Sequence, residues 1–361
     1  MDNRNTEKGY TIEALREIKI DAPDEEVRRK VLANWDLVAK PLDGMGRFEK
    51  LIAQIGAIHG RPEIDIAKKA VVIFCADNGV VEEGVSQSDQ EVTLAVAKNM
   101  AAKASSVGRM AACIGADTIP VDVGINHREK IDGVLDRKIR CGTRNFRSEP
   151  AMTKEETIRS IFTGIEMAAY CKGRGYRMLA TGEMGIGNTT TSSAAAAALL
   201  DLPALQVTGR GAGLTDEKLR RKCEIIEEAL RRYELRGADP VHILETVGGL
   251  DIGALAGLCI GGALYRLPVA LDGVISMTAA LLAERIVPGT KAYLLASHKG
   301  KEPATKKLAQ ALGMSPVIDG ELALGEGTGA VMLFSLLDMA LAVYRESNTF
   351  ADIQIENYQR E

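Results

Sequence analysis

Residues 182–190 read GEMGIGNTT and lie between a short apolar run, Tyr176 to Ala180, and an alanine-rich run, Ala194 to Ala198. The first run is typical of a buried strand, and alanine has the highest helix propensity of all residues. A strand, a glycine-rich turn and a helix in this order form the repeating unit of a parallel α/β sheet. At such turns, free backbone N–H groups at the helix start favour the binding of a phosphate. On these residues alone, a tight turn with a capping threonine is an equally good interpretation.

The same alternation of strand and helix continues on both sides of this unit. Four more apolar runs end in polar or glycine-rich turns and are predicted to be strands: 71–75, 119–123, 269–271 and 293–296. Helices are predicted at 94–114, 154–172, 189–200, 216–232 and 278–285. The pattern predicts an α/β fold, a parallel sheet with helices on both faces. The two chain ends are helix-like, so we expect a small helical domain from 1–60 with 331–361, and a large α/β catalytic domain from 61–330.

Composition excludes several classes of protein. A net charge of -4 provides no broad basic surface, so we expect no nucleic-acid partner. No signal peptide and no membrane span are predicted, because the first residues are polar and the apolar stretches are interrupted by polar residues. The six cysteines are scattered without a CxxC pair and the four histidines are isolated, so we expect no metal. These features favour a cytoplasmic protein.

Two further glycine-rich turns precede predicted helices. Residues 209–214 read GRGAGL, and the helix that follows carries Lys222, which is either a phosphate ligand or an ordinary solvated lysine. Residues 324–330 read LGEGTGA and place Glu326 between glycines. A carboxylate presented in this way can approach a substrate closely and act as a general base, although a surface turn is about equally consistent with the residues.

Together the motifs resemble the nicotinate-nucleotide:dimethylbenzimidazole phosphoribosyltransferase family of cobalamin lower-ligand synthesis. The resemblance runs from about Lys40 to the end, through KP at 40–41, ADNGV at 76–80, GTRNF at 142–146, the three glycine-rich turns, LDG at 271–273 and ASH at 296–298. It implies a Rossmann-like large domain, a small helical domain, a homodimer and no cofactor. The implied reaction transfers the phosphoribosyl group of nicotinate mononucleotide to a benzimidazole-type base with inversion. The products would be α-ribazole phosphate and nicotinate, for assembly of the cobamide nucleotide loop.

The resemblance also implies roles for residues in the matching motifs. Glu326 matches the general base, and Lys222 matches the lysine beside the phosphate. The other residues expected to bind substrate are Glu183, Gly185, Gly187, Asn188, Thr189, Gly209, Arg210, Gly211, Ser86, Gln90, Asp272 and Ser297.

This chain departs from the family pattern at two places near the expected base pocket. It has Asn78 where the family usually has histidine, and Ser88-Asp89 where the family often has an aromatic residue and proline. An alternative is therefore a related enzyme that prefers adenine or a phenol as the base. Two other classes remain. A nicotinamide-dependent dehydrogenase would need a third glycine that the 182–190 turn lacks, and a nucleotide-binding regulator would leave Glu326 unexplained.

Overall fold

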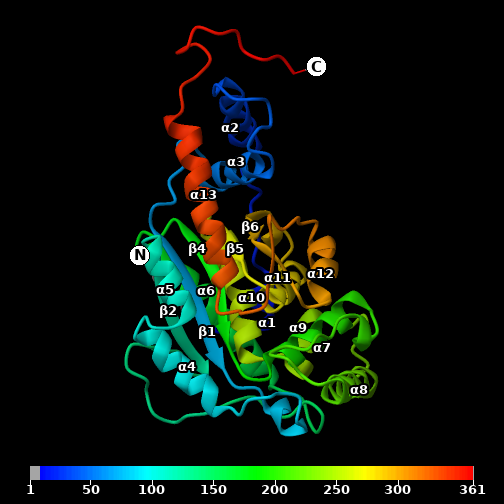
Figure 1. Cartoon of the computed structure of the whole chain (residues 1–361). Coiled ribbons are helices and arrows are strands. Elements are labelled where there is room, and N and C mark those ends of the chain that lie inside the picture. Colours follow the sequence, from blue (N-terminus) through cyan, green and yellow to red (C-terminus); the bar gives the residue numbers. More distant parts are fainter. Residues whose placement is uncertain (1–8, 361) are drawn as a thin grey trace.

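The central sheet contains six parallel strands in the computed structural model, which describes residues 9–360. These strands are β1 (Lys69–Ala76), β2 (Asp117–Gly124), β3 (Leu135–Asp136), β4 (Met178–Met184), β5 (Val269–Leu271) and β6 (Leu294–Ala296). They lie in the order β3-β2-β1-β4-β5-β6, which is the strand order of dinucleotide-binding Rossmann folds. The predicted Rossmann-like α/β fold is therefore confirmed (Figure 1). The strand order reverses between β1 and β4, and that point is where such folds bind ligands.

Strand β1 explains why the sheet carries helices on both faces. All eight of its residues are buried, and alternate side chains point to opposite faces. Val72 and Phe74 pack in one core with α6 (Lys154–Gly173), α7 (Asn188–Leu200), α10 (Leu250–Leu264) and α11 (Val274–Ile286). Val71 and Ile73 pack in a second core with α3 (Arg47–His59), α4 (Glu91–Ala101), α5 (Ser106–Cys113) and α13 (Thr328–Glu346). Both faces are covered, which requires the continuous apolar run seen in the sequence.

Several predicted boundaries were wrong. The single helix predicted at 94–114 is two helices, α4 and α5, because Lys103 adopts a left-handed conformation and Ser105 caps α5 by accepting a hydrogen bond from the Gly108 N–H. Strand β4 continues to Met184, so Glu183 lies in the strand and the turn begins at Gly185. Strand β6 begins at Leu294, because residues 290–293 form a 3-10 turn.

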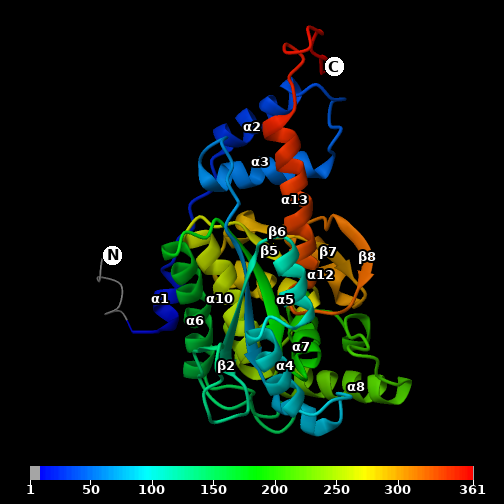
Figure 2. The ribbon, with the colours of Figure 1, turned by 60° about the vertical axis from the view of Figure 1, so that its left-hand side comes forward.

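Two segments far apart in the sequence, the helices α2 (Glu25–Leu37) and α3 and the segment after α13, meet at one end of the molecule (Figure 2). Helices α2 and α3 pack together, and the segment after α13 joins them through hydrogen bonds from Ala39 N to Asn348 O at 2.9 Å and from Phe350 N to Leu37 O at 3.0 Å. Helix α1 (Ile12–Arg16) lies elsewhere: Leu15 belongs to the core of α6 and α10. The division into 1–60 with 331–361 and 61–330 stays a prediction.

Helix α13 runs from the turn that carries Glu326 to the end of the molecule where α2 and α3 pack (Figure 2). It is long and apolar enough to cross a membrane by length and composition, but half of the apolar stretch is buried inside the protein, against helices such as α3 and α5 and the strands β4 and β5. This burial is that of a core helix in a globular fold. The first residues of α13 follow the turn that carries Glu326, so the position of that carboxylate depends on the packing of the helix.

Candidate active site

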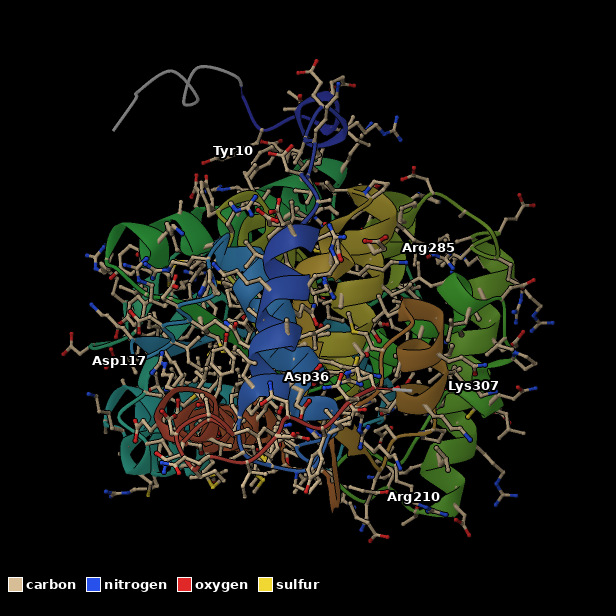
Figure 3. All side chains as sticks on the ribbon, turned by 90° about the horizontal axis from the view of Figure 1, so that it is seen from above. Tyr10, Asp36, Asp117, Arg210, Arg285 and Lys307 are labelled. Carbon is tan, nitrogen blue, oxygen red and sulfur yellow. The ribbon has the colours of Figure 1, made fainter. Side chains whose placement is uncertain are left out.

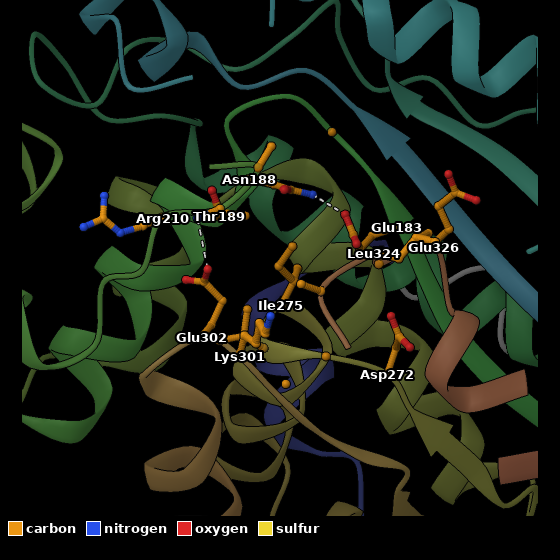
Figure 4. A pocket seen from close by; sticks show the side chains of 18 of the residues that line it. Glu183, Asn188, Thr189, Arg210, Asp272, Ile275, Lys301, Glu302, Leu324 and Glu326 are labelled. Atoms are coloured by element: carbon orange, nitrogen blue, oxygen red, sulfur yellow. Dashed lines mark hydrogen bonds between the residues drawn. The ribbon is translucent and has the colours of Figure 1, made fainter. Parts of the chain in front are cut away.

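A pocket of about 230 Å³ opens at the carboxyl ends of the central strands (Figure 4). It is lined by residues that follow β4, β5 and β6, by the turn at 210–214, and by the segment 85–87. Ten of the residues predicted from the sequence line it: Ser86, Glu183, Gly185, Gly187, Asn188, Thr189, Arg210, Gly211, Asp272 and Glu326. The fold thus brings segments that are far apart in the sequence to the position where Rossmann folds bind ligands.

Two buried carboxylates share one amide beside the pocket. The Asn188 side chain donates from Nδ2 to Glu183 Oε2 at 2.5 Å and to Asp251 Oδ2 at 2.9 Å. Burial raises the pKa of Glu183 and of Asp251 to about 7 each, although the bonds from Asn188 stabilise the ionised forms. Groups with pKa values near 7 can gain or lose a proton at physiological pH, which suits acid–base chemistry.

Glu326 has a strained backbone that the surrounding structure holds in place. Its φ of 62° lies in the left-handed region, as do those of Gly325 (83°) and Gly327 (95°). That conformation costs a residue with a Cβ about 1–2 kcal/mol. Asp272 fixes the loop, since its carboxylate accepts hydrogen bonds from Gly327 N at 3.2 Å and Gly329 N at 2.8 Å. Strain that neighbouring groups maintain in this way is typical of functional sites.

The carboxylate of Glu326 faces the start of α5. Its Oε2 accepts a hydrogen bond from the Val107 N–H at 3.3 Å, and burial raises the pKa of the group. Figure 4 shows it pointing away from Asn188 and Thr189. The Glu326 backbone N–H instead lies near the Glu183 carboxylate and lowers the pKa of that group, which partly opposes the effect of burial. To reach a substrate between the glycine-rich turns, the Glu326 side chain must rotate from α5 towards the pocket.

Lys222 connects two of the glycine-rich turns from behind the pocket lining. It lies on α8 (Asp216–Arg232), is fully buried, and donates from Nζ to Thr189 Oγ1 at 3.0 Å and to Gly209 O at 3.4 Å. Burial lowers its pKa to about 8. The alternative of an ordinary solvated lysine is therefore wrong, and Lys222 supplies a positive charge to both turns at neutral pH.

Other predicted residues lie away from the pocket centre. The Arg210 guanidinium donates to Leu214 O at 2.7 Å and pairs with Asp216, so it points to the outside of the molecule (Figure 3). Ser297 is buried behind the lining, with its Oγ 2.9 Å from Nδ1 of His298. Burial lowers the pKa of His298, which keeps its ring neutral at pH 7.

The segment expected to border the base pocket is held by polar contacts. Ser86 lines the pocket and its Oγ accepts from Ser88 N at 3.2 Å. Gln90 lies one layer further back, where it donates to Asn78 O at 3.3 Å and accepts from Asn126 at 2.9 Å. Asn78, the departure from the family pattern, is fully buried, and its Oδ1 has no hydrogen-bond partner among the residues that the structure describes.

Sequence reasoning missed three residues of the site: Asp251, His298 and Glu302. Asp251 is a lone charged residue in the apolar segment that became α10, and this signal could have identified it. Glu302 comes directly before Pro303 and faces the 209–213 turn, which no local pattern indicates.

The strand order, the glycine-rich turns at helix starts and the buried lysine are features of the class of α/β proteins that bind phosphate-bearing ligands. A family model described as phosphoribosyltransferase matches residues 20–355. A nicotinate-nucleotide–dimethylbenzimidazole phosphoribosyltransferase from Ruminiclostridium cellulolyticum is 44% identical over 96% of this chain and 97% of its own length. One from Geobacter metallireducens is 40% identical over 92% and 95%. The chain belongs to this phosphoribosyltransferase family.

A solved structure agrees with this assignment. The crystal structure of CobT from Thermus thermophilus superimposes with a TM-score of 0.87 at 37% identity, covering 92% of this chain and all of the other.

Proposed function

We propose that this protein transfers the phosphoribosyl group of nicotinate mononucleotide to 5,6-dimethylbenzimidazole, releasing nicotinate. The observation that carries the proposal is the arrangement of Lys222, the turn at 209–213 and the turn at 185–190 on one side of the pocket, with Glu183 and Glu326 on the other. The family assignment supports it, and the activity for which the relatives are named favours a benzimidazole base over the adenine or phenol of the alternative prediction.

The phosphate occupies the turns joined by Lys222. Gly209 and Gly211 let the backbone come close to the phosphate oxygens, the start of α7 adds N–H donors, and the ammonium of Lys222 supplies the charge. Arg210 contributes its backbone here, because its side chain is engaged with Leu214 and Asp216.

The departure of nicotinate needs no proton from the protein. The bond between the ribose C1′ and the pyridinium nitrogen breaks, and nicotinate leaves with both electrons of that bond, which neutralises its ring. One ring nitrogen of the benzimidazole forms the new bond to C1′ from the opposite face, which inverts the configuration from β to α. The other ring nitrogen loses its proton to a carboxylate. Holding the two substrates in line supplies much of the acceleration.

Glu326 is the proposed acceptor of that proton. Its raised pKa brings it closer to neutral pH, and its backbone is fixed at the pocket by Asp272. Glu183 lies beside the Glu326 backbone, has a pKa of about 7, and is the next candidate for the base. Ser86 lies where it can contact the benzimidazole, with Gln90 behind it.

The test is an incubation of the purified protein with nicotinate mononucleotide, with and without 5,6-dimethylbenzimidazole. The proposal requires nicotinate release that depends on the base. Release that is equal without the base would instead indicate a hydrolase, and hydride transfer to or from a nicotinamide would indicate a dehydrogenase.

The protein further acts as a homodimer in the cytoplasm under this proposal. Met332 and Met339 are seven positions apart on one side of α13 and are 38% and 57% exposed, and Leu324 beside the pocket is 54% exposed. Such a stripe on a helix favours contact with a second chain. The free cysteines among the described residues suit a reducing compartment.

A further inference from the structure

The segment between β7 (His298–Gly300) and α12 (Ala304–Leu312) contains Glu302, and the carboxylate of Glu302 lies against the 209–213 turn. Glu302 Oε1 accepts a hydrogen bond from the Gly211 N–H at 3.0 Å. A Cβ added to Gly209 would lie 2.0 Å from Glu302 Oε2, so the carboxylate lies directly against the Cα of that glycine. Figure 4 shows Glu302 directed towards this turn on the side of the pocket that carries Thr189 and Arg210, away from Glu183 and Glu326.

The Glu302 carboxylate also affects the pKa of the buried Lys222. The charge of Glu302 raises the pKa of Lys222, partly opposing the effect of burial. Glu302 therefore takes the two kinds of contact that a phosphate would take in this turn: a backbone N–H and the field of the Lys222 ammonium. A carboxylate and a phosphate cannot share these donors without strong repulsion, because like charges a few ångströms apart destabilise each other inside a protein.

From this geometry we infer that Glu302 is a specificity-determining residue that occupies the phosphate site of the free protein and must be displaced by the substrate. The inference rests on the proposed function, since it takes the 209–213 turn as the phosphate site. Inorganic phosphate must compete with Glu302 for the Gly211 N–H and for the charge of Lys222, and it gains in addition only the N–H groups at the start of α7. A nucleotide adds contacts from its ribose and its ring, which outweigh the cost of moving the glutamate. Discrimination through a built-in repulsive group is a general way to reject a smaller ligand that shares one chemical feature.

The structure allows the glutamate to move. Glu302 is partly exposed, and the residue before it, Lys301, has a side chain that is 59% exposed. The short β7–β8 sheet, with β8 at Ile318–Leu322, lies at the rim of the pocket and apart from the six-stranded sheet. Its residues Gly300 and Leu322 line the pocket beside Glu302.

The experiment measures the binding of inorganic phosphate by calorimetry to the wild type and to Glu302→Ala. Glu302→Ala should bind phosphate about tenfold more tightly or better, a change of about 1.4 kcal/mol. Glu302→Gln, which keeps an acceptor for the Gly211 N–H but loses the charge, should fall between the two. The matched control is Asp319→Ala on β8, which removes one negative charge from a side chain that is 67% exposed and pairs with Lys299, outside the pocket lining; it should bind phosphate as the wild type does.

Nicotinate riboside, which lacks the phosphate, separates the two possible roles of Glu302. Its affinity should be unchanged in Glu302→Ala, because the glutamate acts at the phosphate position. Weaker binding of the riboside with no gain for phosphate would overturn the inference and would make Glu302 a ligand of the ribose hydroxyls. Equal phosphate binding by all variants would also overturn it, while base-dependent nicotinate release by the wild type would leave the proposed function standing.

Discussion

Replacing Lys222 by methionine removes the buried charge that joins the two phosphate turns, while an unbranched side chain of similar length still fills the space. Lys222 is fully buried, and its hydrogen-bond partners Thr189 Oγ1 and Gly209 O are neutral. A hydrogen bond to a charged group contributes about 1.5–3 kcal/mol, so the affinity for nicotinate mononucleotide should fall about 10- to 100-fold.

The pH dependence makes this prediction specific. Burial lowers the pKa of Lys222 to about 8, so the free wild-type protein loses the charge as pH rises through 8. Nucleotide affinity in the wild type should therefore decrease above pH 8, and Lys222→Met should lack this decrease.

The Lys222→Met variant should bind the nucleotide more weakly without being less stable than the wild type. Below pH 8 the lysine is protonated in both the folded and the unfolded state, and burial penalises the folded one. Lys222→Met should then be at least as stable as the wild type at pH 7, which excludes unfolding as the cause of weaker binding. The assay is calorimetry from pH 6.5 to 9.5, with Lys218→Met, an exposed lysine one turn earlier on α8, as the control. Unchanged affinity in Lys222→Met, or a decrease above pH 8 that persists in this variant, would show that the Lys222 charge does not bind the phosphate.

Three further predictions concern the carboxylates. Glu326→Gln should lower turnover by roughly 100- to 10,000-fold with little change in nucleotide affinity; near wild-type turnover, with chemistry rate-limiting, would move the role to Glu183. Asp272→Asn should lower the free energy of unfolding in urea by about 1–3 kcal/mol, because an amide provides one acceptor oxygen for the N–H groups at the start of α13; an unchanged midpoint would show that they are satisfied otherwise. Glu183→Gln should raise the melting temperature at pH 8 but not at pH 4. The pKa of Glu183 is raised to about 7 in the folded protein, so ionisation of this buried carboxyl destabilises the fold as pH rises through about 7. An equal effect of the substitution at both pH values would contradict this.

The sequence predicted the fold where burial leaves a clear pattern. Strand β1 is buried on both faces and so appears as a continuous apolar run, and the turn after β4 is marked by its glycines. The break between α4 and α5 was missed because it contains neither glycine nor proline and depends on Lys103 adopting a left-handed conformation. The extension of β4 through Glu183 was missed because a polar residue that is buried by tertiary contacts has the same local signature as one in a turn.

The site was predictable only in part, for a physical reason. The family motifs identify the turns, but the direction of each side chain depends on partners that are distant in sequence. Arg210 turns outward because Asp216 and the Leu214 carbonyl hold it, and Glu326 turns towards Val107 at the start of α5. The pKa shifts of Glu183 and Asp251 arise from burial around Asn188, which no spacing in the sequence reveals.

The configuration of the product is the most direct test of phosphoribosyl transfer to the benzimidazole in this pocket. Proton NMR of the nucleotide formed from nicotinate mononucleotide and 5,6-dimethylbenzimidazole reports the anomeric linkage and the base attached to C1′. In-line displacement in this pocket predicts an α-linked benzimidazole riboside phosphate, formed in equal amount to the nicotinate released. A β-linked product, or ribose 5-phosphate in place of a new nucleotide, would contradict in-line transfer to the benzimidazole.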